Sequence, residues 1–367
     1  MRDLFIGLMS GTSLDGVDGV LVDFAGGRMQ VLAFESQPFT VEDKAELLAL
    51  NTPGENELHR AALSANALAV LYSDVVHQLL FLADTRADQV EAIGAHGQTV
   101  RHRPGEFDGI GYTLQLNNPA LLAELTGITV VADFRSRDVA AGGQGAPLVP
   151  AFHQQVFGRA GEAVAVLNIG GISNLSLLDG QILGFDCGPG NALMDYWCQL
   201  HTGQPFDADG AWAASGTVHP SLLAALLDEP YLAKAPPKST GRDLFNPPWL
   251  AAKLQGFAGL AAVDVQATLT ELTASAIATC VGSYGKSSKQ LIVCGGGALN
   301  GYLMHRLQAL LPGLQVQSSA THGLPPLRVE AAAFAWLARQ TVRGLPGNLA
   351  SVTGARGERV LGAVYPA

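Results

Sequence analysis

The sequence predicts an α/β protein with mixed sheets, built from two related halves that close on one nucleotide. Strand, glycine turn and strand follow one another over residues 4–24, and the same order returns over 163–178. A third glycine cluster, Gly295-Gly296-Gly297, follows the apolar run 291–294. Either hairpin alone could be an ordinary turn, but all three features in this order favour a nucleotide-binding pair of halves.

The first glycine turn has the composition of a phosphate loop. It combines Gly11 and Gly16 with Thr12, Ser13 and Asp15. Small residues let backbone N–H groups converge on an anion, and the hydroxyls add further donors. A carboxylate in such a loop can hold a phosphate-bound metal, directly or through water.

Further strands and helices alternate after the first hairpin. The expected strands cover 31–34, 92–95, 113–116 and 128–132, and the expected helices cover 57–84 and 119–126. Residues 101–108 form a polar segment, and the glycine-rich stretch 142–147 follows the last of these strands. We expect the first domain boundary near that stretch.

The second half repeats this plan. Strands are expected at 182–185 and 290–294, and helices at 192–201, 265–284, 301–311 and 329–342. The Pro-rich segment 228–248 is expected to be irregular, and the tail 359–365 to be a strand that returns to the first domain. The predicted domains are therefore 1–135 with 349–367, and 136–348.

Composition limits the possible functions. The 367 residues are 48% hydrophobic and 15% charged, which is typical of a globular chain long enough for two domains. The formal net charge of −10 argues against a nucleic-acid surface, so a polyphosphate would need local amides, a few arginines and a metal. No apolar run approaches the roughly 18 residues of a membrane helix, and the N-terminus does not resemble a signal peptide. Four cysteines without CxxC spacing indicate a reduced, cytoplasmic protein.

Three familiar motifs are rejected. Gly285-Lys286-Ser287 resembles the end of a P-loop, but Cys280 stands where that pattern needs glycine, and the surrounding order is helix then strand. The glycine triplet is not a GxGxxG fingerprint. His96 and His102 lack a third ligand at zinc-like spacing.

Asp186 is the candidate catalytic residue. It follows a strand and precedes a glycine-rich turn and a helix N-terminus. Ligands of open α/β sheets bind at such strand ends, so this carboxylate is either a general base or a helix cap. The two phosphate-type hairpins favour the base.

Other polar residues at strand ends are candidates for substrate binding. Asp133 and Arg135 follow a strand, where arginine suits a carboxylate or a phosphate; an interdomain salt bridge is the alternative. His96 and Thr99 offer hydrogen bonds for a sugar-like ligand, although a capped turn would look similar. Glu330 lies in a first helical turn, where a glutamate is often only a partner of the helix dipole.

These segments together resemble the anhydro-N-acetylmuramic acid kinase family. The resemblance covers nearly the whole chain and is specific in combination. Its motifs are 6–18, 94–99, 132–135, 143–148, 168–174, 185–191 without Cys187, 238–242 and 294–297.

The resemblance implies a two-domain actin-like ATPase architecture (the sugar kinase, Hsp70 and actin superfamily) with an interdomain cleft. It implies that ATP and water open the 1,6-anhydro ring of anhydro-N-acetylmuramic acid with phosphorylation of O6, in cell-wall recycling. Asp186 would activate the water, Asp15 would hold Mg²⁺, and a cytoplasmic homodimer is expected. The implied substrate contacts are His96, Thr99, Asp133, Arg135 and Glu330. The implied nucleotide contacts are Gly11, Thr12, Ser13, Leu14, Asp15, Gly16, Val17, Asp18, Asn168, Gly170, Gly171, Gly295, Gly296 and Gly297.

Two other functions remain open at this stage. A kinase for an ordinary hexose or amino sugar would act on a free sugar and not on the anhydro sugar. A nucleotide-dependent clamp of the chaperone or actin kind would hydrolyse ATP without stimulation by any sugar. No long interaction segment is visible in the sequence to favour the clamp.

Overall fold

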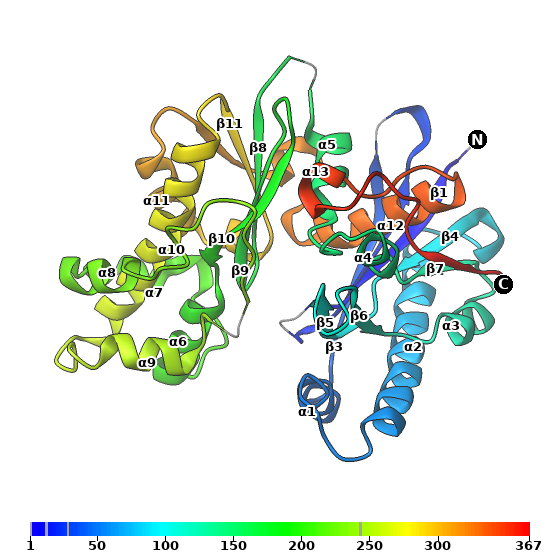
Figure 1. The fold of residues 1–367 in the computed structure, drawn as a ribbon, viewed down its shortest axis with the longest axis horizontal. Coiled ribbons are helices and arrows are strands. Elements are labelled where there is room, and N and C mark those ends of the chain that lie inside the picture. The colour runs from blue at the N-terminus through cyan, green and yellow to red at the C-terminus, as the bar shows by residue number, and fades with distance from the viewer. Residues whose placement is uncertain (1, 12–13, 28, 160, 242–243) are drawn as a thin grey trace. The chain divides into compact units, whose positions relative to one another are not determined.

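The computed structural model describes residues 2–11, 14–27, 29–159, 161–241 and 244–367. It divides into two compact units, Met1–Val156 with Arg328–Ala367, and Phe157–Leu327 (Figure 1). Residues 136–156 and 328–348 thus lie with the first unit, whereas the sequence prediction had placed them in the second domain. The reason is local packing: the helix over 329–342 lies against the central strands of the first sheet.

The first unit contains a six-stranded mixed sheet. Its strands, in spatial order, are β13 (Ala363–Tyr365), β7 (Val130–Ala132), β4 (Val90–Ala95), β1 (Leu4–Met9), β2 (Gly16–Asp23) and β3 (Gln30–Pro38). Strands β1, β4 and β7 run parallel, and β2, β3 and β13 pair antiparallel to their neighbours. The C-terminal strand therefore returns to the first unit, as predicted.

Helices cover both faces of this sheet. The helices are α1 (Val41–Ala49), α2 (Glu57–Leu82), α3 (Pro119–Thr126), α4 (Ser136–Ala140), α5 (Val149–Phe157), α12 (Val329–Val342) and α13 (Ala350–Thr353). Gly7 and Gly94 are neighbours in the sheet, and a Cβ on either would overlap a backbone carbonyl of α12. Gly19 pairs with Leu8 and therefore faces the other way, toward Val75 of α2. The glycines thus let α12 approach the sheet closely while α2 covers the opposite face.

Helix α2 forms part of the core of the first unit. By length and composition it is the one helix in the described part of the chain that could cross a membrane. Its buried residues, however, pack against β2, β3 and α3, as those of a core helix do.

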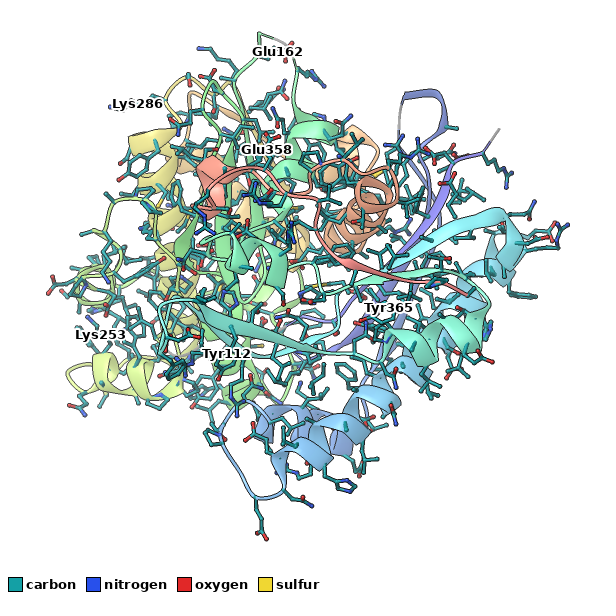
Figure 2. All side chains as sticks on the ribbon, turned by 45° about the vertical axis from the view of Figure 1, so that its right-hand side comes forward. Tyr112, Glu162, Lys253, Lys286, Glu358 and Tyr365 are labelled. Atoms are coloured by element: carbon teal, nitrogen blue, oxygen red, sulfur yellow. The ribbon has the colours of Figure 1, made fainter. Side chains whose placement is uncertain are left out.

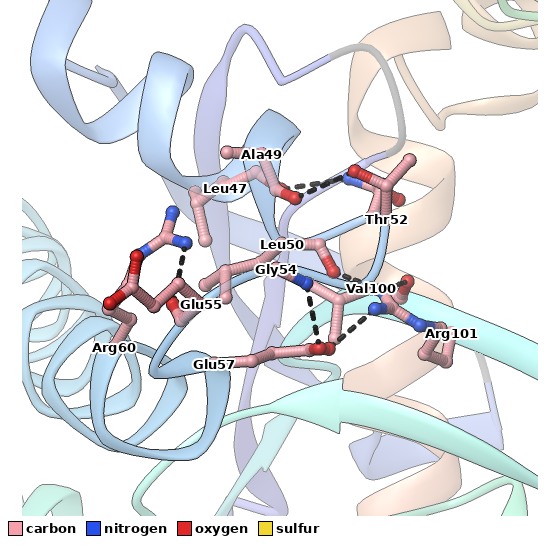
Figure 3. A network of polar contacts seen from close by, with 11 residues as sticks. Leu47, Ala49, Leu50, Thr52, Gly54, Glu55, Glu57, Arg60, Val100 and Arg101 are labelled. Atoms are coloured by element: carbon pink, nitrogen blue, oxygen red, sulfur yellow. Dashed lines mark hydrogen bonds and ion pairs between the residues drawn. The ribbon is translucent and has the colours of Figure 1, made fainter.

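A separate hairpin follows β4. It consists of β5 (Gln98–Pro104) and β6 (Gly111–Leu116), so part of the expected polar segment 101–108 is a strand. Arg101 of β5 donates to the backbone carbonyl of Leu50 and pairs with Glu57 at the start of α2 (Figure 3). The sequence did not predict this strand, because β5 lacks the apolar pattern by which strands are recognised. Its charged side chains instead bond to neighbouring elements, as Arg101 does to Glu57.

The second unit repeats the strand order of the first. Its sheet reads β10 (Leu183–Pro189), β9 (Ile172–Leu177), β8 (Val164–Ile169), β11 (Gln290–Cys294) and β12 (Gln315–Ser318). This is the order β3-β2-β1-β4-β7 of the first sheet, with the same antiparallel hairpins and the same parallel central strands. The repetition confirms the predicted α/β architecture with mixed sheets and two related halves.

The helices of the second unit surround α10 (Ala262–Tyr284), most of whose residues are buried. The others are α6 (Ala192–Thr202), α7 (Ala211–Ala214), α8 (Pro220–Leu227), α9 (Pro247–Leu254) and α11 (Gly301–Leu310). Helix α9 begins with Pro247 after Asn246, whose side chain accepts the Trp249 N–H, and α8 begins in the same way after His219. Helices α8 and α9 and strand β12 were not predicted. Lys286 lies in the turn between α10 and β11, consistent with the rejection of a P-loop (Figure 2).

Candidate functional site: two glycine hairpins and their carboxylates

The β1–β2 turn joins a buried anchor to an exposed carboxylate. Leu14 has φ of 57° and packs with Leu47, Leu50, Val100 and Leu116. Val17 is also buried, so only the backbone of these two residues can meet a ligand. The carboxylate of Asp15 is largely exposed and lies 3.6 Å from Nζ of Lys44. Thr12 and Ser13, which the sequence predicts as nucleotide contacts, lie outside the described residues.

A cavity of about 180 Å³ opens beside this turn. Its lining residues are Met9, Gly11, Asp15, Gly16, Asp18, Ser36, Pro38 and Glu330. Three of them carry carboxylates, supplied by the phosphate-type turn, by β2 and by the first turn of α12. The structure therefore brings Gly11, Asp15, Gly16, Asp18 and Glu330 together around one cavity of the first unit.

The electrostatics of this cavity disfavour negative charge. Burial raises the pKa of Asp18, against a hydrogen bond from Ser36, and the nearby Asp15 raises it further. Burial and the Asp18 carboxylate raise the pKa of Glu330, while Arg135 acts in the opposite direction. A bound cation would relieve this crowding of carboxylates.

The oxygen donors of this cavity fit a magnesium ion that also binds phosphate. Within the described ranges no three His, Cys, Asp or Glu side chains converge to hold a metal by themselves. Mg²⁺ commonly uses only one or two carboxylates and completes its shell with phosphate oxygens and water. Exposed Asp15 is suited to that role, with Asp18 beside it in the same cavity.

Arg135 is held from two sides. Its Nε and Nη2 donate to Nε2 of His96 at 3.2 and 3.0 Å, and its Nη1 donates to the Gly145 carbonyl at 2.8 Å. Burial lowers the pKa of Arg135 to about 10, and the carboxylates of Glu330 and Asp138 partly offset this. At neutral pH it is therefore a half-buried cation.

His96 is buried and neutral. Its Nδ1 lies 3.3 Å from the Ser10 carbonyl, which can only accept, so Nδ1 carries the hydrogen and Nε2 accepts from Arg135. Burial and the Arg135 charge lower the pKa of His96 to about 3. Both ring nitrogens are thus occupied within the protein, and neither is free for the sugar contact expected from the sequence.

Two further candidates of the first unit have ordinary local bonds. Asp133 is exposed with φ of 58°, and its Oδ1 accepts the Ser136 N–H at 3.4 Å. Thr99 lies at the start of β5, and its hydroxyl accepts from Nε2 of Gln115 at 3.2 Å. The carboxylate of Asp133 and the hydroxyl of Thr99 keep further hydrogen-bonding capacity for a ligand.

In the second unit, the β8–β9 turn is tied to the start of α6. The Gly170 carbonyl accepts the Asn191 N–H at 2.8 Å, and the Gly171 carbonyl accepts the Gly190 N–H at 2.9 Å. A Cβ on Gly190 would overlap the Gly170 carbonyl, so this close approach needs glycine. The second predicted loop is therefore a rigid turn.

The glycine triplet lies beside this turn. Gly295 has φ of 77°, and a Cβ there would overlap both the Asn168 side chain and the Ile169 carbonyl. A Cβ on Gly297 would overlap the side chain of Ile169, whereas Gly296 is less constrained. The predicted nucleotide residues of this unit, Asn168, Gly170, Gly171 and Gly295–Gly297, therefore form one cluster.

Asp186 lies within β10, immediately before a bulge in its pairing with β9. Its Oδ2 accepts the Thr240 N–H at 2.9 Å and the Ser239 hydroxyl at 3.1 Å. Burial raises the pKa of Asp186, and the bonds from Thr240 and Ser239 partly counteract this. Asp186 is thus a positioned carboxylate and not a helix cap, and no hydrogen bond from the described residues reaches its Oδ1. A bulge commonly redirects a side chain at such sites.

The sequence interpretation assigned no role to Ser239, Thr240 or Asp138. Ser239 and Thr240 stood in the motif 238–242, but only the structure shows that this loop folds back onto Asp186. The signal available in the sequence was the polar composition of a segment inside an otherwise irregular Pro-rich stretch.

Comparison with known proteins gives a consistent result. The family model described as "Anhydro-N-acetylmuramic acid kinase" matches residues 3–367. A protein of that name from Variovorax paradoxus (strain S110) is 71% identical, over 100% of this chain and 99% of its own length. Another, from Albidiferax ferrireducens (strain ATCC BAA-621 / DSM 15236 / T118), is 66% identical over 100% of both chains. Among solved structures, the activator of the 2-hydroxyisocaproyl-CoA dehydratase from Clostridium difficile with bound ADPNP is 11% identical with a TM-score of 0.47, covering 94% of this chain and 96% of that one.

Proposed function

This chain belongs to the anhydro-N-acetylmuramic acid kinase family, and we propose from its residues how it performs the reaction of that family. It uses ATP and water to open the 1,6-anhydro ring of anhydro-N-acetylmuramic acid and phosphorylates O6. The products are N-acetylmuramic acid 6-phosphate and ADP, in peptidoglycan recycling. The assignment of roles to residues rests on the Asp186 carboxylate. Its Oδ2 is held by hydrogen bonds from Ser239 and Thr240, and burial raises its pKa.

Asp186 is the general base in this proposal. It takes a proton from water while the water oxygen attacks the anomeric carbon and the bond from that carbon to O6 breaks. The electron pair released onto O6 attacks the γ-phosphorus, and the bond from that phosphorus to ADP breaks. An inverting glycosidase normally needs an acid to protonate its leaving oxygen. Here the phosphoryl group captures the oxygen, so one carboxylate is sufficient.

Arg135 binds the lactyl carboxylate of the sugar. It is a partly buried cation, where a charge-assisted bond to a carboxylate is stronger than in water. Thr99 and Glu330 supply further substrate hydrogen bonds, and Asp133 offers an exposed carboxylate. These roles extend the family assignment to individual residues.

The two glycine hairpins bind the nucleotide. Backbone amides of residues 11–18 take the phosphates, and Asp15 holds the Mg²⁺ that accompanies them. When bound, the metal neutralises charge on the phosphates. Asn168, Gly170, Gly171 and the triplet Gly295–Gly297 contact the rest of ATP, since they form one cluster at the ends of the neighbouring strands β8 and β11.

A cytoplasmic homodimer is also part of the proposal. The four cysteines are all buried thiols, as expected for a protein of a reducing compartment. Sedimentation of the purified protein at micromolar concentration tests the dimer.

The deciding experiment is a coupled ATPase assay with Mg²⁺, with and without 1,6-anhydro-N-acetylmuramic acid, and with mass analysis of the sugar product. We expect ATP consumption that depends on the sugar, and a product heavier by one water and one phosphoryl group. A phosphorylated product without added water would overturn the coupled hydrolysis. Activity only on free sugars would favour the other kinase, and ATP turnover that no sugar stimulates would favour the clamp.

A further inference from the structure

His96 lies between the phosphate-type turn and Arg135. Its Nδ1–H faces the carbonyl of Ser10, the residue before Gly11, and its Nε2 accepts twice from Arg135. Its backbone N–H donates to the Leu8 carbonyl at 3.0 Å, and its ring packs on Phe334 with ring centroids 4.6 Å apart. The imidazole is therefore fixed at every polar atom and on one face.

This arrangement determines which part of the Arg135 guanidinium is available. A guanidinium has five N–H groups. The Nε–H and one Nη2–H are directed to His96, and one Nη1–H is directed to Gly145. In the described part of the chain, one N–H on each terminal nitrogen has no partner, and such a pair suits the two oxygens of a carboxylate.

We propose that His96 is a positioning residue that sets the specificity of this enzyme for a sugar bearing a carboxylate. It does so by occupying the Nε edge of Arg135, so that the two terminal nitrogens face the substrate. His96 does not touch the sugar, because both its nitrogens are used and its side chain is 5% exposed. The inference rests on the proposed function, since it assumes that Arg135 meets the lactyl carboxylate.

Two alternatives to this role are less consistent with the geometry. A direct substrate contact would need a free ring nitrogen, which His96 lacks. A protonated His96 would place two cations in contact, and the neutral ring is the form that burial beside Arg135 favours. The hydrogen bond to the Ser10 carbonyl further fixes the imidazole against the residue that precedes Gly11, the first of the proposed phosphate contacts.

The test compares two sugars that differ only in the lactyl group, 1,6-anhydro-N-acetylmuramic acid and 1,6-anhydro-N-acetylglucosamine. His96→Phe keeps a ring but removes the acceptor of the Arg135 hydrogen bonds. In this variant we expect kcat/KM for the muramic sugar, divided by kcat/KM for the glucosamine sugar, to fall roughly 10- to 100-fold. The loss should appear in KM for the muramic sugar, with KM for ATP unchanged. His96→Gln, whose amide oxygen can accept from Arg135, should recover part of the ratio. His153→Phe is the matched control, since His153 is a second fully buried histidine of the same unit.

A double-mutant cycle then separates positioning from general stability. If His96 acts through Arg135, His96→Phe should not lower the ratio further in an Arg135→Lys background. The inference would be overturned if the two substitutions lowered the ratio independently, so that their effects multiplied in the double variant. It would also be overturned if His96→Phe lowered kcat/KM equally for both sugars.

A second experiment tests the role of His96 even if the proposed function is wrong. If wild-type protein does not turn over the anhydro sugar, crystals of His96→Gln and His96→Phe still report on positioning. A guanidinium that keeps the same edge toward the position of residue 96 in both variants would overturn the inference. A guanidinium that turns in His96→Phe and not in His96→Gln would support it.

Discussion

The carboxylate of Asp138 accepts the backbone N–H of Gly145 at 2.7 Å, and the carbonyl of this same glycine accepts a hydrogen bond from Arg135. The other oxygen of Asp138 accepts from Asn348 at 2.6 Å and from the Thr353 hydroxyl at 2.7 Å. One fully buried acid thus joins the glycine loop 142–145 and the C-terminal segment to the arginine of the candidate site.

Asp138→Asn should therefore destabilise the protein. An amide group in this position must direct an N–H at one of the three donors, which leaves that donor unpaired. We expect a loss of about 2–4 kcal/mol in the free energy of unfolding, measured by urea denaturation. Thr353→Val removes one donor only and should cost about 1 kcal/mol. Equal effects of the two variants would contradict this account.

Asp186→Asn should retain binding of ATP and sugar and lose turnover. Asparagine keeps the shape but cannot take a proton from water, and loss of a general base typically costs about 10²–10⁴-fold in kcat. Single-turnover assays together with calorimetric binding separate the two effects. Activity close to wild type in this variant would remove Asp186 from the role of base.

Ser239→Ala should move the acidic limb of the kcat–pH profile to higher pH. The Ser239 hydroxyl stabilises the charged form of Asp186, so its removal raises the pKa of a group whose pKa burial has already raised. The base works only when deprotonated, so activity should be lost at a higher pH than in wild type as the pH falls. Ser215→Ala, an exposed serine of the same unit, is the control. A shift to lower pH would show that Ser239 does not act on this carboxylate.

Arg135→Lys should weaken sugar binding much more than nucleotide binding. A lysine ammonium is a point charge and cannot bond to His96, Gly145 and a carboxylate in one plane. We expect KM for the anhydro sugar to rise roughly 10- to 100-fold, with KM for ATP nearly unchanged. Equal rises for both substrates would indicate a role in folding instead.

Gly295→Ala should destabilise the second unit and weaken ATP binding. With φ of 77° and ψ of 178°, Gly295 lies in a region of the backbone that is nearly restricted to glycine, at a cost of about 1–3 kcal/mol for alanine, and overlap with the Ile169 carbonyl adds to this. Gly259→Ala is the matched control, because a Cβ at Gly259 meets open space. Thermal unfolding and KM for ATP give the two measurements, and an unchanged melting temperature in Gly295→Ala would refute the structural argument.

Strong apolar periodicity explains which elements could be predicted. Strand β11 and helices α3 and α12 begin and end at the predicted residues, because their apolar runs are bounded by clear turn or capping signals. Strand β5 was missed because its charged residues bond to other elements, as Arg101 does with Glu57. Short α8 and α9 lie where proline content favours loops, and their caps are visible only once the helix is known.

Local sequence suggests candidate residues for the site but does not describe their contacts. Asp186 and Arg135 were identified from the residues that precede them. The neutral ring of His96 and the return of Ser239 to Asp186 depend on folds of the chain over 39 and 53 positions, respectively. Hydrogen bonds across such separations have no signature in a single sequence.

The order in which the two units appear in the chain has a consequence for synthesis on the ribosome. Residues 157–327 are continuous, so the second unit is complete before residues 328–367 are translated. The first unit starts earlier but lacks α12, which packs on β1 and β4, until residue 342, and lacks β13 until residue 365. The second unit can therefore fold before the first, which leaves β1 and β4 uncovered on one face until α12 has been translated.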